Sequence, residues 1–339
     1  MKIVILLFFT VFSCGKKTDS TENVEVKIER NATQQSIVFI AGFDEGKNTY
    51  YTNAESYFRT KNITVVNNQF SLEEILLWLN QHQYKNYKEI HIVSHSNPWR
   101  GMSLKATENG ERITLESLLK AKKNKNLPML KAGIINNTNL IFHSCGLGEN
   151  QALVRQLKSV FTAIKTPKVY VSSFFNIFGG NIATHYLAKP YYGYYPTAES
   201  PGPLQISKEL KQQYPKVAID WFRALKKRKP IKEGDVYTYK FNIPISWEFT
   251  FEEGTVLPKF TNKEALMDWV SSNEMAAEAL YKLGIPMEKY RWKSQVKGNT
   301  LYIKGKTTVV CVMQPLMELN DDTTYRFPQL KDKELYHLF

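Results

Sequence analysis

The fold is decided by the stretch IHIVSHSN, residues 90–97, and by a second stretch of the same design, NLIFHSCGLG, residues 139–148. In both, a short apolar run leads directly into small polar residues. Such runs predict buried parallel strands over residues 90–93 and 140–143. His95 lies in the polar segment after the first strand, and Cys145 lies in the segment after the second. The two stretches therefore place an imidazole and a thiol at the ends of two predicted strands.

Strands and helices alternate on either side of these stretches. Apolar runs predict further strands at residues 37–40, 63–66 and 169–171. Helical patterns lie between the strands at residues 53–60, 72–79, 114–123 and 150–161. Ser71 and Glu74 form a capping-box pattern at the start of the second of these helices. Because this alternation is typical of α/β proteins, we expect a three-layer domain built on a mostly parallel sheet.

The pattern changes in the second half of the chain. Residues 189–203 (KPYYGYYPTAESPGP) are rich in Pro, Gly and Tyr and predict a loop, and a helix is expected over residues 207–225. The basic run KKRKP at residues 226–230 is the best candidate for a domain boundary. Beyond it the pattern is β-like at residues 236–251 and 290–312, with turn signals at Gly298-Asn299 and Lys304-Gly305 and a helix over residues 263–283 between them. We therefore expect an α/β domain over residues 34–229 and a smaller α+β domain over residues 230–339.

The N-terminal residues predict a targeting segment. Lys2 precedes an apolar run over residues 3–12, which is shorter than the roughly 20 residues that a membrane-spanning helix needs. The run ends in Val11-Phe12-Ser13-Cys14, which resembles the lipobox of bacterial lipoproteins and implies lipidation of Cys14. An ordinary secretory signal and a buried strand are the alternatives. Residues 1–14 are thus expected to be a lipoprotein signal and residues 15–33 a flexible tether, in a protein anchored to the cell envelope at the outer membrane or its periplasmic face.

Composition limits the classes of function. Of the 339 residues, 43% are hydrophobic, which excludes wholesale disorder. The net charge of +13 suits an acidic partner, but the excess is spread along the chain and the sequence shows no nucleic-acid-binding motif, so we expect no nucleic acid partner. Three cysteines are too few for a disulfide framework. No cofactor or metal is expected, and the sequence does not indicate an oligomeric state.

His95 and Cys145 are the strongest candidates for catalysis. Because parallel strands present their carboxyl ends at one edge of a sheet, both residues are expected at the same edge. A thiol needs a neighbouring base to become a thiolate, and an imidazole supplies one. Gly146 leaves the thiol uncrowded, and backbone N–H groups beside it are candidate donors to an oxyanion. The alternative is an inert buried Cys145 and a hydrogen-bonded His95 in a loop.

The two stretches resemble the signature blocks of caspase-like cysteine peptidases, the superfamily of caspases, gingipains and clostripain. The resemblance covers about residues 36–185, and the leading strand IVFIAG at residues 37–42 agrees with it. It implies a dyad in which His95 is the base and Cys145 the nucleophile, acting on a protein or peptide. Ser96 stands where that family usually has the glycine that donates an oxyanion N–H, so Ser96 and Gly146 are the oxyanion candidates.

Two other functions remain open. The fold could serve as a catalytically inactive binding or scaffold module, with Ser96 a symptom of lost activity. Alternatively, Ser94–Pro98 faintly resembles the G-x-S-x-G elbow of α/β-hydrolases, with Ser96 as nucleophile and His185 or His337 as the late histidine. The elbow glycines are replaced by Ser94 and Pro98, which disfavours this hypothesis.

The remaining candidates have simpler explanations. His91 and His143 lie within predicted strands, which favours packed positions, and the spacing of His91 and His95 lacks the helical geometry of a zinc site. Cys311 is expected to be a core thiol. Residues 191–203 and 226–232 are the segments most open to proteolysis, and self-cleavage at the second would require acidic side chains beside Cys145.

Overall fold

The computed structural model describes residues 35–44, 49–82, 86–131, 134–135, 137–179, 184–232, 234–317 and 325–339. These residues belong to one compact unit. The predicted signal (residues 1–14), its Cys14 and the predicted tether (residues 15–33) lie outside the described residues, so these stay predictions. Among the described residues, none of the helices is both long and apolar enough to cross a membrane.

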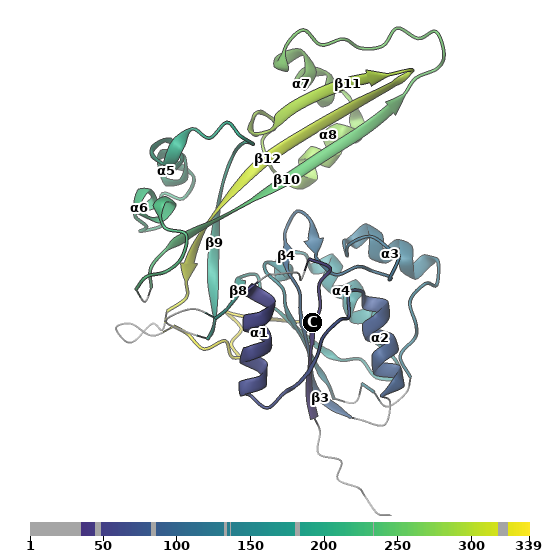
Figure 1. The fold of residues 1–339 in the computed structure, drawn as a ribbon, viewed down its shortest axis with the longest axis vertical. Coiled ribbons are helices and arrows are strands. Elements are labelled where there is room, and N and C mark those ends of the chain that lie inside the picture. Colours follow the sequence, from purple (N-terminus) through teal and green to yellow (C-terminus); the bar gives the residue numbers. More distant parts are fainter. Residues whose placement is uncertain are drawn as a thin grey trace, which may run out of the picture. The chain divides into compact units, whose positions relative to one another are not determined.

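The first sheet is built from six strands in the order β13-β7-β6-β3-β1-β2. The strands are β1 (Gln35–Ile40), β2 (Thr64–Val66), β3 (Tyr87–Val93), β6 (Asn139–His143), β7 (Lys168–Val171) and β13 (His337–Leu338). Five of them run parallel, and the C-terminal β13 pairs antiparallel with β7 at the edge. The expectation of an α/β fold with a mostly parallel sheet is confirmed (Figure 1).

Apolar side chains of β1 lie on both faces of this sheet. On one face, Val38 and Ile40 pack against α1 (Thr49–Thr60) and against Phe178 of β8 (Phe175–Phe178). On the other face, Ile37 and Phe39 belong to a core shared with α2, α3 and α4, which span Leu72–Gln81, Leu115–Lys123 and Gln151–Val160. The Ser71 side chain accepts a hydrogen bond from Glu74 N at 3.1 Å, as the capping pattern predicts.

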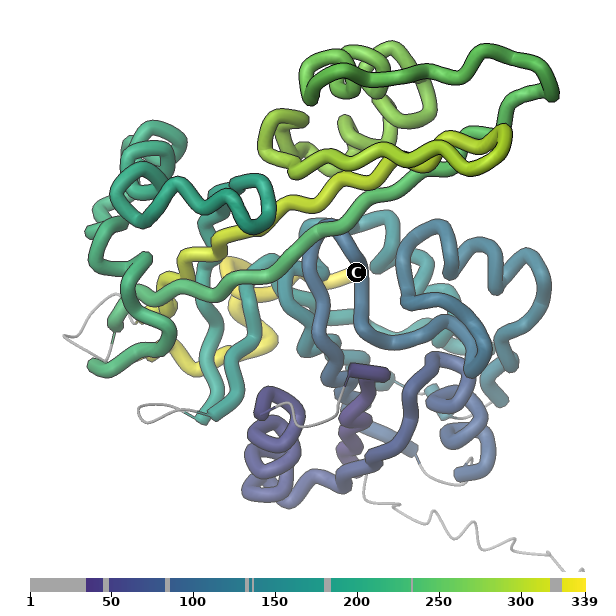
Figure 2. Tube along the Cα trace, turned by 45° about the horizontal axis from the view of Figure 1, so that its top comes forward, coloured from purple at the N-terminus to yellow at the C-terminus, as the bar shows by residue number. Residues whose placement is uncertain are grey.

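The second sheet is antiparallel and follows the order β10-β12-β9-β8, with β11 also paired to β12. Its remaining strands are β9 (His185–Pro196), β10 (Tyr237–Thr250), β11 (Arg291–Lys297) and β12 (Thr300–Pro315). Helices α7 (Lys263–Ser272) and α8 (Glu274–Leu283) pack on one face of β10 and β12. Helices α5 (Gly202–Gln213) and α6 (Trp221–Lys226) cover the part of the opposite face nearest β9. Figure 2 shows β10 and β12 running side by side.

Three expectations for this half of the chain were wrong in detail. The predicted loop over residues 189–203 is strand β9 as far as Pro196, with side chains that alternate between buried and half-buried. Gly298-Asn299 does form the turn between β11 and β12, but Lys304-Gly305 lies inside β12. Each of the two long helices predicted here is two shorter ones: α5 and α6, and α7 and α8. Asn273 separates the second pair because its side chain accepts from Ala276 N and starts α8 anew.

Strands from both sides of residue 230 share the second sheet, since β9 pairs with β12 along nine residue pairs. The C-terminal β13 returns to the first sheet. The predicted boundary between residues 229 and 230 therefore does not coincide with a break between sheets. A short hairpin, β4 (Ser96–Asn97) with β5 (Gly101–Met102), follows β3 and carries the chain past the carboxyl ends of the parallel strands.

Candidate active site

The carboxyl ends of three parallel strands meet at the point where the order of the sheet reverses. From β1 the chain passes to β2 on one side and then to β3 on the other, so the reversal lies between β1 and β3. Ligands bind at such points in open α/β sheets. Asp44 follows β1, His95 follows β3, and Cys145 follows β6, which pairs directly with β3.

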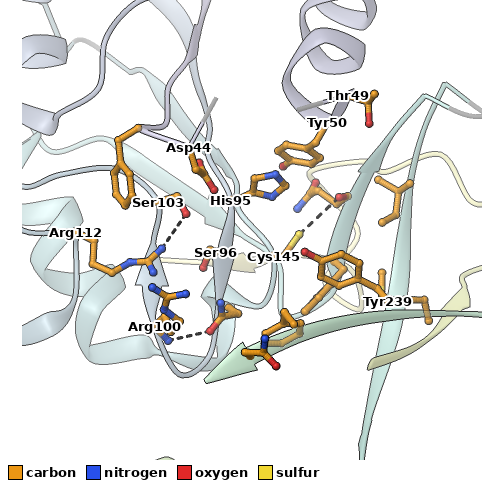
Figure 3. A pocket seen from close by; sticks show the side chains of 18 of the residues that line it. Asp44, Thr49, Tyr50, His95, Ser96, Arg100, Ser103, Arg112, Cys145 and Tyr239 are labelled. Atoms are coloured by element: carbon orange, nitrogen blue, oxygen red, sulfur yellow. Dashed lines mark hydrogen bonds between the residues drawn. The ribbon is translucent and has the colours of Figure 1, made fainter. Parts of the chain in front are cut away.

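These three residues line one pocket of about 680 Å³. Figure 3 shows the His95 imidazole and the Cys145 sulfur pointing into it. Its wall also includes β8, the β4–β5 hairpin and strand β10 of the second sheet. The structure thus brings together the two residues that the sequence singled out for catalysis, and adds a wall from the second half of the chain.

Aromatic rings hold His95 in place. The imidazole stacks on Tyr50, with ring centroids 4.3 Å apart, and meets the edge of Tyr51 at 4.9 Å. The Tyr51 hydroxyl accepts from His95 N at 3.0 Å and donates to Asp44 Oδ1 at 2.7 Å. A Cβ at Gly42 would lie 2.1 Å from this hydroxyl, so glycine is required there. Burial lowers the pKa of His95, and the Asp44 carboxylate opposes that shift only in part, so the imidazole is neutral at pH 7.

Cys145 is held as a thiol. It is 7% exposed, and its Sγ donates to the main-chain oxygen of Asn176 at 3.7 Å (Figure 3). Burial raises the pKa of the Cys145 thiol to about 12. Because the pKa of His95 moves down and that of Cys145 moves up, the pair rests as imidazole and thiol rather than as an ion pair. A proton transfer to His95 is then needed before the sulfur can attack.

The two oxyanion candidates differ in this structure. Gly146 N donates to the Phe174 carbonyl at 3.2 Å, so its N–H is engaged. Ser96 is buried, lines the pocket and pairs with Met102 in the β4–β5 hairpin. The oxyanion role of both stays a prediction. Ser96 begins a hairpin rather than a helix, so the strand–turn–helix context of a hydrolase elbow is absent, and neither His185 nor His337 lines this pocket.

A chain of buried polar side chains lies behind Cys145. His91 Nδ1 and His143 Nε2 are 2.9 Å apart, and the Oδ1 of Asn176 lies 3.4 Å from His143 Nδ1 and 3.2 Å from His185 Nε2. Burial lowers the pKa of His143 well below its usual range and that of His185 to about 3, so both imidazoles are neutral. These contacts fix the side chain of Asn176. The main-chain carbonyl of the same residue accepts the hydrogen bond from the Cys145 thiol. As expected from the sequence, His91 and His143 are packed within the protein.

The sequence did not single out the charged residues of the pocket. Arg100 and Arg112 line it together with Asp44. Arg112 donates to Ser103 Oγ at 2.8 Å and lies over the Phe43 ring, and neither arginine forms an ion pair with a described residue. Burial and the neighbouring Arg100 lower the pKa of Arg112. The pocket therefore has two guanidinium groups and one carboxylate. Glu149, the acid nearest to Cys145 in sequence, does not line it.

Comparison of the chain with family models, with curated proteins and with solved structures found no match. Within the described ranges, no three His, Cys, Asp or Glu side chains are grouped so that they could hold a metal ion. Cys311 is fully buried in β12 within an apolar cluster, as expected for a core thiol.

Proposed function

We propose that this protein is a cysteine peptidase in which His95 is the general base and Cys145 the nucleophile. The observation that carries the proposal is that the two side chains follow adjacent, directly paired parallel strands and line the same pocket. The resemblance to caspase-like peptidases supports the same assignment of roles. A peptide substrate is proposed because the pocket is bounded by the edge strand β10, which has a neighbour in the sheet on one side only.

The reaction begins from the neutral pair. As a peptide carbonyl approaches, the Cys145 thiol gives its proton to His95 and the sulfur attacks the carbonyl carbon. His95 then gives the proton to the departing amine, and a thioester to Cys145 remains. A water molecule, deprotonated by His95, hydrolyses the thioester and restores the thiol. Asn176 positions the sulfur through its carbonyl oxygen.

The charges of the pocket favour an acidic substrate residue. Arg100 and Arg112 lack an ion-pair partner among the described residues, so a carboxylate entering the pocket would gain charge-assisted hydrogen bonds. Self-cleavage in the basic segment at residues 226–232 is correspondingly disfavoured.

Substitution of Cys145 tests the function. Cleavage of fluorogenic peptides with Asp, Glu, Lys or Arg before the scissile bond should favour the acidic set, and Cys145→Ala should lower the rate by about 10³-fold or more. Cys311→Ala serves as the matched control and should retain activity. Cleavage that survives in Cys145→Ala but not in Ser96→Ala would instead identify a serine hydrolase.

The pH dependence follows from the direction of the His95 shift. The base must be neutral, and its pKa lies below the usual 6.5. We therefore expect the acid limb of the kcat/KM profile to be centred below pH 6.5, and His95→Gln to lose peptide cleavage. An acid limb centred above pH 6.5 would contradict the neutral-pair mechanism.

A non-catalytic scaffold is the second candidate, favoured by the buried, protonated thiol and by the engaged Gly146 N–H. Iodoacetamide separates the two. A peptidase should lose activity as Cys145 is alkylated, with the site confirmed by peptide mass spectrometry. A scaffold should show no peptide cleavage, whether or not Cys145 is alkylated.

We further propose that the protein is tethered to the cell envelope through lipidated Cys14. Support comes from the sequence alone, from the apolar run that ends at this cysteine. A palmitate analogue should label the wild type but not Cys14→Ser. An unlabelled wild type that fractionates with soluble proteins would contradict the anchor.

A further inference from the structure

One face of the second sheet is covered by helices along one part of β12 and exposed along the other. From Thr308 onward the face is packed against α5 and α6, with Val310 and Val312 fully buried. From Lys306 back toward Thr300, the side chains that point to the same face are exposed or half-buried. The strands β10 and β11 continue this uncovered part on either side.

Four cations gather on the uncovered part. Arg291 lies directly opposite Lys306 and Lys293 directly opposite Lys304, in the antiparallel pairing of β11 with β12. All four side chains are exposed, and they border a hollow of about 540 Å³ together with Ser246 and Thr197. We call Arg291, Lys293, Lys304 and Lys306 the basic face.

The fold gives no reason for this arrangement. Like charges directly opposite each other on one face destabilise a β ladder. Among the described residues, Glu199 is the ion-pair partner of Arg291: its Oε1 lies 3.6 Å from Arg291 Nε, and because both side chains are about half exposed this ion pair is weak. The three lysines form no ion pair with any residue in the described ranges. The counter-charge to these lysines is therefore not supplied by any described residue.

We propose that the basic face binds a ligand with two phosphate groups, one for each cross-strand pair of cations. A phosphate group carries one negative charge as a diester and close to two as a monoester, so a pair of cations can neutralise it. Successive positions on one face of a strand are about 7 Å apart, which sets the separation of the two groups. Arg291 adds a planar fork suited to phosphate oxygens, and the lysines add point charges. This site is independent of the proposed peptidase function.

The phosphate groups have two possible sources, a lipid headgroup or a soluble phosphate ester. Full-length Cys14→Ser protein, which lacks the proposed anchor, is used for both arms. In the first arm, vesicles with cardiolipin, a lipid with two phosphates, are compared with phosphatidylglycerol vesicles of equal phosphate content. In the second, fructose 1,6-bisphosphate is compared with fructose 6-phosphate. Cardiolipin or fructose 1,6-bisphosphate should bind at least tenfold more tightly than the probe with which it is compared. The arm that shows this difference identifies the source of the phosphate groups.

Charge removal tests the site itself. Lys293→Gln with Lys304→Gln removes one pair, and Arg291→Gln with Lys306→Gln removes the other. Each double variant should weaken binding of the preferred probe about tenfold or more and abolish the preference for two phosphates. The matched control, Lys120→Gln with Lys123→Gln on α3, removes the same charge from another exposed surface and should bind as the parent does. Binding that is absent in both arms, or equal in the pair variants and the control, overturns the proposal.

Discussion

The two sheets of this protein use their surfaces in opposite ways. The parallel sheet is covered on both faces, largely by apolar side chains, so its strand ends are what it offers to a ligand. The antiparallel sheet is covered by α7 and α8 on one face but only partly covered on the other, and there it presents lysines and an arginine. Parallel strands joined by helices bury both faces by construction, whereas antiparallel strands joined by turns can leave one face in water. A catalytic site is thus expected at the edge of the parallel sheet, and a ligand-binding surface on the exposed face of the antiparallel sheet.

The largest effect should come from a matched pair of core truncations. Phe39 is fully buried in β1 and packs edge-to-face on Trp78, whereas the half-buried Phe249 of β10 packs the same way on Trp269. Phe39→Ala should lower the free energy of unfolding by about 3–5 kcal/mol, and Phe249→Ala by about 1–2 kcal/mol. Urea denaturation measures both. Equal losses would show that the two sheets do not differ in burial as described.

The next effect is the acid sensitivity of two buried histidines, His143 in β6 of the parallel sheet and His185 in β9 of the antiparallel sheet. His143 and His185 are neutral in the folded state with lowered pKa values, whereas in the unfolded state they take up a proton near pH 6.5. Their contribution to stability is therefore fully present above pH 6.5 and is lost as pH falls toward about 3 for His185. The slope should be about 1.4 kcal/mol per pH unit for each histidine. His185→Gln should remove one histidine's share of the slope between pH 6 and 4, and an unchanged slope would rule out the assignment.

The smallest effect concerns the close contact between β11 and β12. A Cβ at Gly305 would lie 2.9 Å from Trp292 and 3.0 Å from Ile245. Gly305→Ala should destabilise the protein by about 1–3 kcal/mol through overpacking. Thermal unfolding measures this change. Because the first sheet is not touched, peptide cleavage below the melting temperature should be retained, and its loss would indicate that the two sheets are coupled more tightly than the contacts suggest.

The elements with a regular apolar pattern were predictable from the sequence. The apolar runs before His95 and Cys145 identified β3 and β6, and the parallel arrangement then brought both residues to one edge. The same rule could have found Asp44, since it follows the first predicted strand and the pattern IVFIAG. Asn176 gave no comparable signal, because β8 has only four residues and no long apolar run marks it.

The errors have physical causes. Residues 189–196 contain two prolines and a glycine, which predict a loop, yet they form a strand. Pro190 and Pro196 are tolerated because β8 pairs with β9 only as far as Ala188, so that one side of the strand needs no donors beyond this point. Lys304-Gly305 predicts a turn, but Gly305 is the position over which the Trp292 ring packs. Arg100 lies in the turn of the β4–β5 hairpin and Arg112 pairs with Lys105 beyond it, so only tertiary structure brings both to the pocket.

Strand β12 links the pocket wall to the basic face. It runs for sixteen residues, a length of about 50 Å, and pairs with β10 along fourteen of them. Met313 near one end lines the Cys145 pocket, and Lys304 near the other carries part of the basic face. The pocket wall and the basic face are therefore parts of one continuous ribbon, with no break in the β10–β12 pairing between them.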